Sequence, residues 1–134
     1  MAGRESPRYG WDMRRVLIVE DDAALRETMV EILADAGYAV SEARDGREGL
    51  EEADARRPDL ILLDLMMPRM DGWQFRTAQK EHPAIAAIPV IVMSARSSEK
   101  DDGALEGVAA RFSKPFDVAA LLEGVKRYSG AADA

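Results

Sequence analysis

Five short apolar runs alternate with stretches whose apolar residues recur at helical spacing, and this alternation restricts the possible folds more than any other feature. The first, third and fourth runs are apolar throughout, which indicates strands covered on both faces, as in a parallel sheet. The second run mixes polar and apolar residues, as an edge strand does. In chain order the runs are Val16–Val19, Ala39–Ala43, Leu60–Leu63, Pro89–Met93 and a weaker one at Ala110–Ser113.

Helical segments are predicted in every gap between these runs and after the last one. In the first gap, Asp22 stands where a helix N-cap belongs, and Gly37 stands where such a helix would end. The repeated strand–helix order predicts a doubly wound α/β fold with right-handed crossovers. The other helical segments are Gly46–Arg56, Trp73–Glu81, a weaker polar one at Ser97–Gly107, and Asp117–Tyr128.

The 134 residues fit one domain, which we expect at residues 14–129 between short tails at 1–13 and 130–134. The longest apolar stretch, Leu60–Met67, is interrupted by Asp64 and is too short to span a bilayer. The first thirteen residues are polar and charged, unlike a signal peptide. We therefore expect a cytoplasmic protein with no membrane as a partner.

Composition excludes several kinds of chemistry. The net charge of −7 disfavours contact with phosphate backbones, so no nucleic acid is expected as a partner. Cysteine is absent, which excludes disulfides and thiolate metal sites, and the single histidine, His82, cannot by itself build a histidine-ligated zinc site. The reactive groups must then be carboxylates, hydroxyls and lysines.

Residues that can take part in phosphoryl or metal chemistry directly follow the first, third, fourth and fifth apolar runs. Ligands of parallel sheets bind outside the carboxyl ends of the strands, so these positions are the informative ones. Glu20 and Asp21 follow the first run, Asp64 the third, Ser94 the fourth and Lys114 the fifth. The sequence therefore predicts acids, a hydroxyl and an amine at one edge of the sheet.

This set of residues suits phosphoryl chemistry with a bound metal. Three acids that converge repel one another and raise one another's pKa. A hard divalent cation with oxygen ligands, Mg²⁺ or Mn²⁺, would relieve that repulsion. An aspartate beside such an ion can act as a nucleophile toward a phosphoryl group. Lys114 could add positive charge and Ser94 a hydrogen bond, since phosphoryl transfer depends mainly on positioning and charge neutralisation.

Four segments carry a resemblance to a known family: VLIVEDD (16–22), LILLDLMMPRMDG (60–72), VIVMSA (90–95) and SKPF (113–116). Together they resemble the bacterial response-regulator receiver domain, and the resemblance extends from about Arg15 to Tyr128. Each segment alone is only moderately specific. All four occur in the family's order, with thirty residues from Asp64 to Ser94, so the combined signal is strong.

The resemblance implies a phosphorylation site that binds Mg²⁺ or Mn²⁺. Asp64 would be the phosphoacceptor and a metal ligand. Asp21 would bind the metal directly, Glu20 would do so through water, and the backbone carbonyl of Met66 would be a further ligand.

The resemblance also implies the remaining site residues and the fold. Ser94 would donate a hydrogen bond to the phosphoryl group, and Lys114 would pair with it. The Lys114-Pro115 peptide bond would be cis, and Asp71-Gly72 would shape the turn into the third helix. The family fold is flavodoxin-like, a five-stranded parallel sheet with the strand order 2-1-3-4-5.

The function implied is that of a single-domain receiver in a two-component system or phosphorelay. A histidine kinase or a histidine phosphotransfer protein would donate the phosphoryl group, and the signal would pass on through protein contacts or onward phosphotransfer. Such a chain catalyses only its own phosphorylation and dephosphorylation, so we do not expect an enzyme. Two alternatives are a receiver-like binding module that works without phosphorylation, and a small aspartate-nucleophile phosphatase. The complete acid set disfavours the former, and the lack of an evident second catalytic acid or substrate-covering cap disfavours the latter.

One position departs from the family pattern. Relatives signal phosphorylation through a hydroxyl, here Ser94, and an aromatic residue three positions before the lysine, where this chain has Arg111. The adjacent Phe112 should point to the opposite face of its strand, because side chains alternate along a strand. We therefore predict that the usual switch between hydroxyl and aromatic residue is altered here.

Overall fold

The computed structural model describes residues 13–94 and 105–130. Most of the expected tails, and most of the helix expected at 97–107, lie outside the described residues. Of that helix only residues 105–107 are described, and they form a turn in which Val108 N donates to Leu105 O at 3.2 Å.

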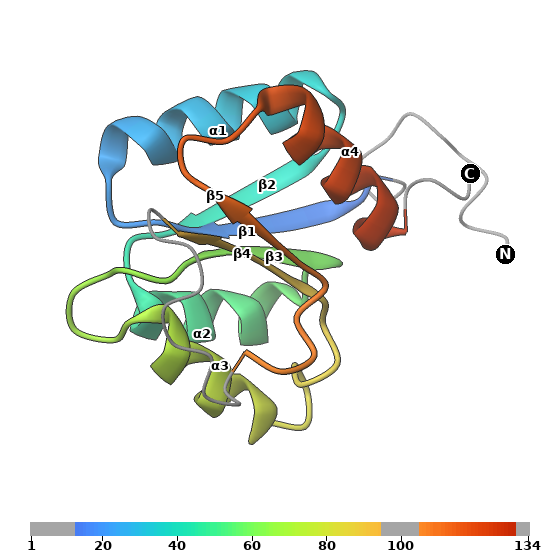
Figure 1. The fold of residues 1–134 in the computed structure, drawn as a ribbon. Coiled ribbons are helices and arrows are strands. Elements are labelled where there is room, and N and C mark those ends of the chain that lie inside the picture. Colours follow the sequence, from blue (N-terminus) through green and yellow to red (C-terminus); the bar gives the residue numbers. More distant parts are fainter. Residues whose placement is uncertain (1–12, 95–104, 131–134) are drawn as a thin grey trace, which may run out of the picture.

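The five strands form one parallel sheet in the order β2-β1-β3-β4-β5, as expected (Figure 1). β3 includes Asp64, one residue beyond the predicted run, and β4 begins one residue later than predicted, after Pro89. A proline has no backbone N–H to give to a strand ladder, which fits its place outside β4. The strands are β1 Arg15–Val19, β2 Ala39–Ala43, β3 Leu60–Asp64, β4 Val90–Ser94 and β5 Ala110–Ser113.

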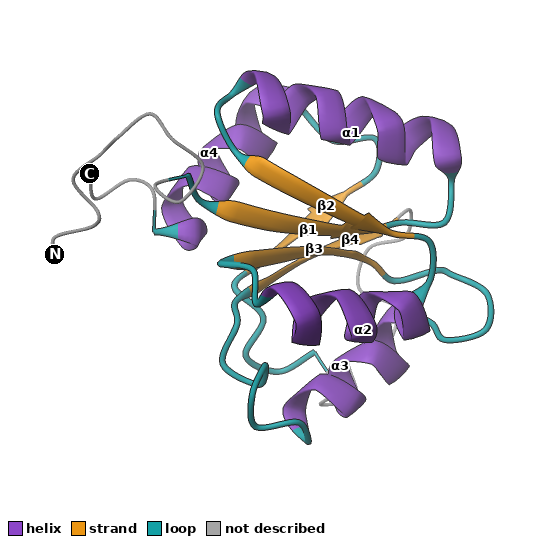
Figure 2. Ribbon diagram, turned by 180° about the vertical axis from the view of Figure 1, so that it is seen from behind, coloured by secondary structure: helices purple, strands orange, loops and turns teal. Residues whose placement is uncertain are grey.

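The described residues form four helices, which cover the two faces of the sheet (Figures 1 and 2). α1 (Ala23–Asp35) and α4 (Val118–Ser129) lie on one face, and α2 (Gly46–Arg56) and α3 (Gly72–Lys80) lie on the other. Among the described residues, no helix combines the length and the hydropathy needed to cross a membrane.

Capping residues set where the helices begin and end. The Asp22 side chain accepts a hydrogen bond from Leu25 N at the start of α1, and Gly37 follows the helix with a φ of +100°, both as predicted. The predictions for α3 and α4 were each wrong by one residue at both ends. Asp71 caps α3, so that helix already begins at Gly72.

The core consists of two apolar clusters separated by the sheet. Side chains alternate along each strand, so neighbouring residues of β3 such as Leu62 and Leu63 belong to different clusters. One cluster packs β-strand residues against Phe75 of α3, and the other packs them against Met29 of α1 and Leu121 of α4. This explains why β1, β3 and β4 are apolar at almost every position, whereas the edge strand β2 is only half-buried.

Candidate phosphoacceptor and metal site

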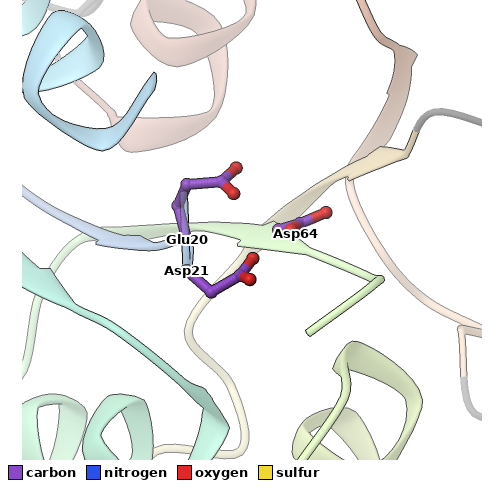
Figure 3. A group of neighbouring side chains, drawn as sticks. All are labelled: Glu20, Asp21 and Asp64. Carbon is purple, nitrogen blue, oxygen red and sulfur yellow. The ribbon is translucent and has the colours of Figure 1, made fainter. Parts of the chain in front are cut away.

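The carboxyl ends of the strands bring the predicted polar residues to one edge of the sheet. Glu20 and Asp21 follow β1, Asp64 and Ser94 end β3 and β4, and Lys114 follows β5. Figure 3 shows the three acidic side chains directed toward a common space. Because all five strands are parallel, their carboxyl ends must share this edge.

Backbone hydrogen bonds hold the turn after β1. Glu20 N donates to Ala43 O at 3.0 Å, which extends the pairing of β1 with β2 by one residue. Arg26 donates to Glu20 O at 2.9 Å, and Asp22 N donates to a Glu20 carboxylate oxygen at 3.1 Å. The buried Glu20 and the exposed Asp21 are thereby held in a short, well-defined turn next to the capped start of α1.

Asp64 is 2% exposed and is fixed at the end of the central strand. Its Oδ1 accepts a hydrogen bond from Met66 N at 3.2 Å. Leu65 N donates to Met93 O at 3.0 Å, and Gly72 N donates to Leu65 O at 2.9 Å. The loop from Leu65 to Asp71 therefore leaves β3 and returns beside it before α3 begins. A Cβ on Gly72 would lie 2.7 Å from Leu65 Cα, so this close return requires glycine.

Lys114 lies between the two buried acids. Its Nζ is 3.0 Å from Glu20 Oε1 and 3.3 Å from Asp64 Oδ1. Lys114 N also donates to Ser94 O at 2.8 Å, which joins the ends of β4 and β5. The Lys114-Pro115 peptide bond is cis, as the resemblance implied.

The three carboxylates have a composition and spacing that suit a hard divalent cation. One carboxylate oxygen from each of Glu20, Asp21 and Asp64 lies within 4.8 Å of the others. Oxygen ligands at such spacing are those that Mg²⁺ and Mn²⁺ prefer. Lys114 offsets only one of the two buried negative charges, so a further cation is electrostatically favoured here.

The charges at the site shift two pKa values. Burial, followed by the negative charge of Glu20, raises the pKa of Asp64 to about 7, although Lys114 partly opposes the shift. Burial alone would lower the pKa of Lys114. Its hydrogen bond to Glu20 and the charge of Asp64 outweigh burial, so the pKa of Lys114 lies above its usual value. The mutual repulsion expected among the acids is thus present at Asp64.

Arg111 and Phe112, which are neighbours on β5, lie on opposite faces of the sheet. Arg111 is exposed on β5 and lies in register with Val92, which faces α2 and α3. Phe112 packs in the opposite cluster, as strand alternation predicted. A Cβ on Gly124 of α4 would lie 3.1 Å from the Phe112 ring, so the ring rests directly on that helix.

One contact close to the site had no signal in the sequence. Arg69, in the loop after β3, donates two hydrogen bonds to Asp45, which precedes α2. The two residues are 24 positions apart, and neither pattern nor spacing pairs them.

The comparisons with known proteins agree with this geometry. The family profile described as the response regulator receiver domain matches residues 16–126. The KDP operon transcriptional regulatory protein KdpE of Escherichia coli is 44% identical over 111 residues, which are 81% of this chain and 48% of that protein. The chain spans about half the length of the curated relatives it matches.

Solved structures show the same fold. Chemotaxis protein CheY4 of Vibrio cholerae has a TM-score of 0.80 at 32% identity and covers 87% of this chain and 98% of its own. The receiver domain of sensor histidine kinase PA1611 of Pseudomonas aeruginosa has a TM-score of 0.80 at 26% identity, covers 88% of this chain and 98% of its own, and has a magnesium ion coordinated in its active-site cleft.

Proposed function

This chain belongs to the response regulator receiver domain family, and we propose that it accepts a phosphoryl group on Asp64 with Mg²⁺ bound beside that residue. The donor would be a histidine kinase or a histidine phosphotransfer protein. One observation carries the assignment of Asp64. Its buried carboxylate ends the central strand and lies within 3.3 Å of Lys114 Nζ and within 4.8 Å of the Glu20 and Asp21 carboxylates.

The metal would be held by Asp21, Asp64 and the backbone carbonyl of Met66, with Glu20 acting through water; Mn²⁺ would suit the same oxygens. When bound, it supplies positive charge to the phosphoryl oxygens. Two of the three site acids, Glu20 and Asp64, contact the Lys114 ammonium, which lies within 3.3 Å of each.

The chain's own residues would perform the transfer. An Asp64 carboxylate oxygen attacks phosphorus while the bond from phosphorus to the donor histidine nitrogen breaks. The Lys114 ammonium stays protonated, since its raised pKa lies far above neutral pH, and it pairs with the phosphoryl oxygens. The Ser94 hydroxyl, at the end of the neighbouring strand, donates a hydrogen bond to one of those oxygens.

The proposal extends to the chain's place in a signalling system. The phosphorylated chain passes the signal on through contacts with a downstream protein or by onward phosphotransfer. The chain catalyses only its own phosphorylation and dephosphorylation. We assign this activity to the cytoplasm, with neither nucleic acid nor membrane as a partner of residues 14–129. The switch residues are Ser94 and Arg111. Relatives use an aromatic residue where this chain has the polar, exposed Arg111, and this difference supports a switch that works differently from the usual one.

Intact mass after incubation with a small phosphodonor and Mg²⁺ tests the proposal. We expect one added phosphoryl group on the wild type and none on Asp64→Ala. Asp59→Ala is the matched control and should keep the label, because Asp59 lies at the opposite end of β3, where it accepts a hydrogen bond from Arg15 N.

Beryllofluoride, a phosphoryl mimic, provides a second readout that needs no donor. Binding by the wild type and by Asp59→Ala, but not by Asp64→Ala, supports the same site. A wild type that neither takes the label nor binds beryllofluoride would overturn the proposal in favour of a binding module that works without phosphorylation.

A further inference from the structure

The loop between β3 and α3 lies against the start of α2, and the two are held closely together. A Cβ on Gly46, the first residue of α2, would lie 2.6 Å from Met70 O and 2.7 Å from Met70 Cγ. Figure 2 shows the loop extending past the beginning of α2 before the chain enters α3. The fit leaves no space for any side chain at residue 46.

An ion pair joins these two segments. Arg69 Nε and Nη2 donate to Asp45 Oδ2 at 3.1 and 2.8 Å. The other oxygen, Asp45 Oδ1, accepts from Glu48 N at 2.9 Å and so caps α2. The hydrogen bond from Glu48 N, followed by that from Arg69, holds the pKa of Asp45 below its usual value. Asp45 is therefore a carboxylate at neutral pH and a fixed anchor for the arginine.

The Arg69 backbone has a conformation that L-residues rarely adopt. Its φ is +63°, in the left-handed region, where side chains other than glycine carry an energetic cost. Glycine would adopt this turn more readily, so the backbone by itself does not explain an arginine here. The two hydrogen bonds to Asp45 give the side chain a role that glycine cannot take.

The loop connects this ion pair to the phosphoacceptor. Met66 is three residues before Arg69, and Met66 N donates to Asp64 Oδ1. The ends of the loop are fixed by the hydrogen bonds of Leu65 N to Met93 O and of Gly72 N to Leu65 O. Arg69 and Asp45 tie the middle of the loop to a separate element, so their ion pair restricts the backbone path of the short loop that contains Met66.

We propose that Asp45 and Arg69 are positioning residues, whose ion pair sets the backbone of Met66 for metal binding beside Asp64. The part that concerns the metal rests on the proposed function. Neither residue acts on the ion itself; each acts through the loop. Groups that orient metal ligands in this way typically change metal affinity 10–100-fold when they are removed.

Arg69→Gly and Arg57→Gly form a matched pair for the test. Arg57 also has a left-handed backbone, with a φ of +47°, and its side chain also donates to an aspartate, from Nη2 to Asp54 Oδ1 at 3.1 Å. Arg57 caps the far end of α2, away from the site. Both variants remove one charge and one ion pair and relieve the same backbone cost, so they differ mainly in their connection to the Met66 loop.

The dissociation constant of Mg²⁺ should rise about tenfold in Arg69→Gly and stay unchanged in Arg57→Gly when measured by titration calorimetry. Electrostatics alone predicts the opposite sign, because removing a positive charge near the site strengthens cation binding. Weaker binding therefore reports lost positioning. An unchanged or tighter constant in Arg69→Gly, or equal weakening in both variants, would overturn the proposal.

Hydrogen exchange at the Met66 amide in metal-free protein provides a readout that is independent of phosphorylation. If the Met66 amide exchanges faster in Arg69→Gly but not in Arg57→Gly, the ion pair positions the loop. Equal exchange rates in the two variants contradict this role. If the wild type does not bind Mg²⁺, the proposed function fails, and the exchange data still decide whether the ion pair positions the Met66 amide.

Discussion

At the scale of single residues, the main feature is the unequal number of buried charges around Asp64. Two buried carboxylates share one ammonium group, since Lys114 Nζ contacts both Glu20 and Asp64. Burial, followed by the negative charge of Glu20, raises the pKa of Asp64 to about 7. Near neutral pH, metal-free protein therefore retains a proton that a bound cation would displace.

This proton makes stability depend on pH. The folded pKa of about 7 exceeds the ordinary value of 3.8, so between these values the native state holds a proton that the unfolded chain has released. The resulting stability is fully present below pH 3.8 and is lost as the pH rises through 7. Asparagine does not titrate, so Asp64→Asn does not lose this stability as the pH rises. We predict that between pH 4 and pH 8 the free energy of unfolding of Asp64→Asn rises by roughly 2–4 kcal/mol relative to that of metal-free wild type.

Urea unfolding of both proteins in the presence of a chelator measures the difference. The comparison uses the change in free energy of unfolding between the two pH values, so groups common to both proteins cancel. The raised pKa of Asp64 would be contradicted if the free energies of unfolding of the two proteins differed by the same amount at pH 4 and at pH 8.

The sequence predicted which residues of the candidate site come together at one edge of the sheet. Glu20, Asp21, Asp64, Ser94 and Lys114 were found because each directly follows or ends a recognisable strand, and parallel strands share one carboxyl edge. Asp45 and Arg69 were missed because their contact depends on the path of a loop. The left-handed backbone of Arg69 has no sequence signature, since such positions usually carry glycine or asparagine.

At the scale of secondary-structure elements, aspartates precede all four described helices. Asp22, Asp45 and Asp71 each accept a hydrogen bond from a backbone N–H of the first turn, and Asp71 forms a capping box with Gln74. Asp117 precedes α4 without such a hydrogen bond from its side chain. These caps fix the points at which the chain turns from strand to helix, and therefore the loops that carry the site.

The entry into α3 is the most constrained of these turns. A Cβ at residue 72 would lie 2.7 Å from Leu65 Cα and 3.0 Å from Asp64 O, so Gly72→Ala must push the helix away from the end of β3. We predict a loss of roughly 1–3 kcal/mol in the free energy of unfolding.

Gly124→Ala in the middle of α4 is the matched control for this prediction. There the added Cβ would meet side-chain atoms rather than backbone, at 3.1 Å from the outer edge of the Phe112 ring and 3.6 Å from Ile91 Cδ1, and alanine has the higher helix propensity. Urea unfolding should give a clearly smaller loss for Gly124→Ala than for Gly72→Ala. Equal losses would mean that the close return of the loop is not what requires glycine at residue 72.

The boundaries of the elements were less predictable than their order. The ends of α3 and α4 each differ from the sequence prediction by one residue. At α3 the capping hydrogen bonds of Asp71, rather than apolar periodicity, decide where the helix begins, whereas α4 begins after Asp117 without such a hydrogen bond. The weak run at 110–113 is a strand because it pairs in parallel with β4. Such long-range pairing is not visible in a local pattern.

At the scale of the whole molecule, the sheet separates two apolar layers, and the position of Phe112 in one of them constrains how a signal can spread. The ring packs with α1 and α4, on the face opposite to Arg111. Moving it to the other face would require a shift of β5 by one residue against β4.

We therefore predict that beryllofluoride with Mg²⁺ leaves Phe112 packed against Gly124 and Ile91. Nuclear Overhauser effects between these residues, recorded with and without the mimic, measure this directly, and Asp64→Ala serves as the control that cannot respond. Loss of these contacts in the wild type alone, together with a rearrangement between Ser94 and β5, would show that the family's usual switch operates despite Arg111.

The strand order has a consequence for communication across the protein. Asp64 ends β3, which is the middle strand of five, with β1 and β2 on one side and β4 and β5 on the other. Its carboxylate therefore lies two strands from either edge of the sheet. A change of charge at Asp64 has the same number of strands to cross in order to reach either edge, so the strand order favours neither flank of the sheet.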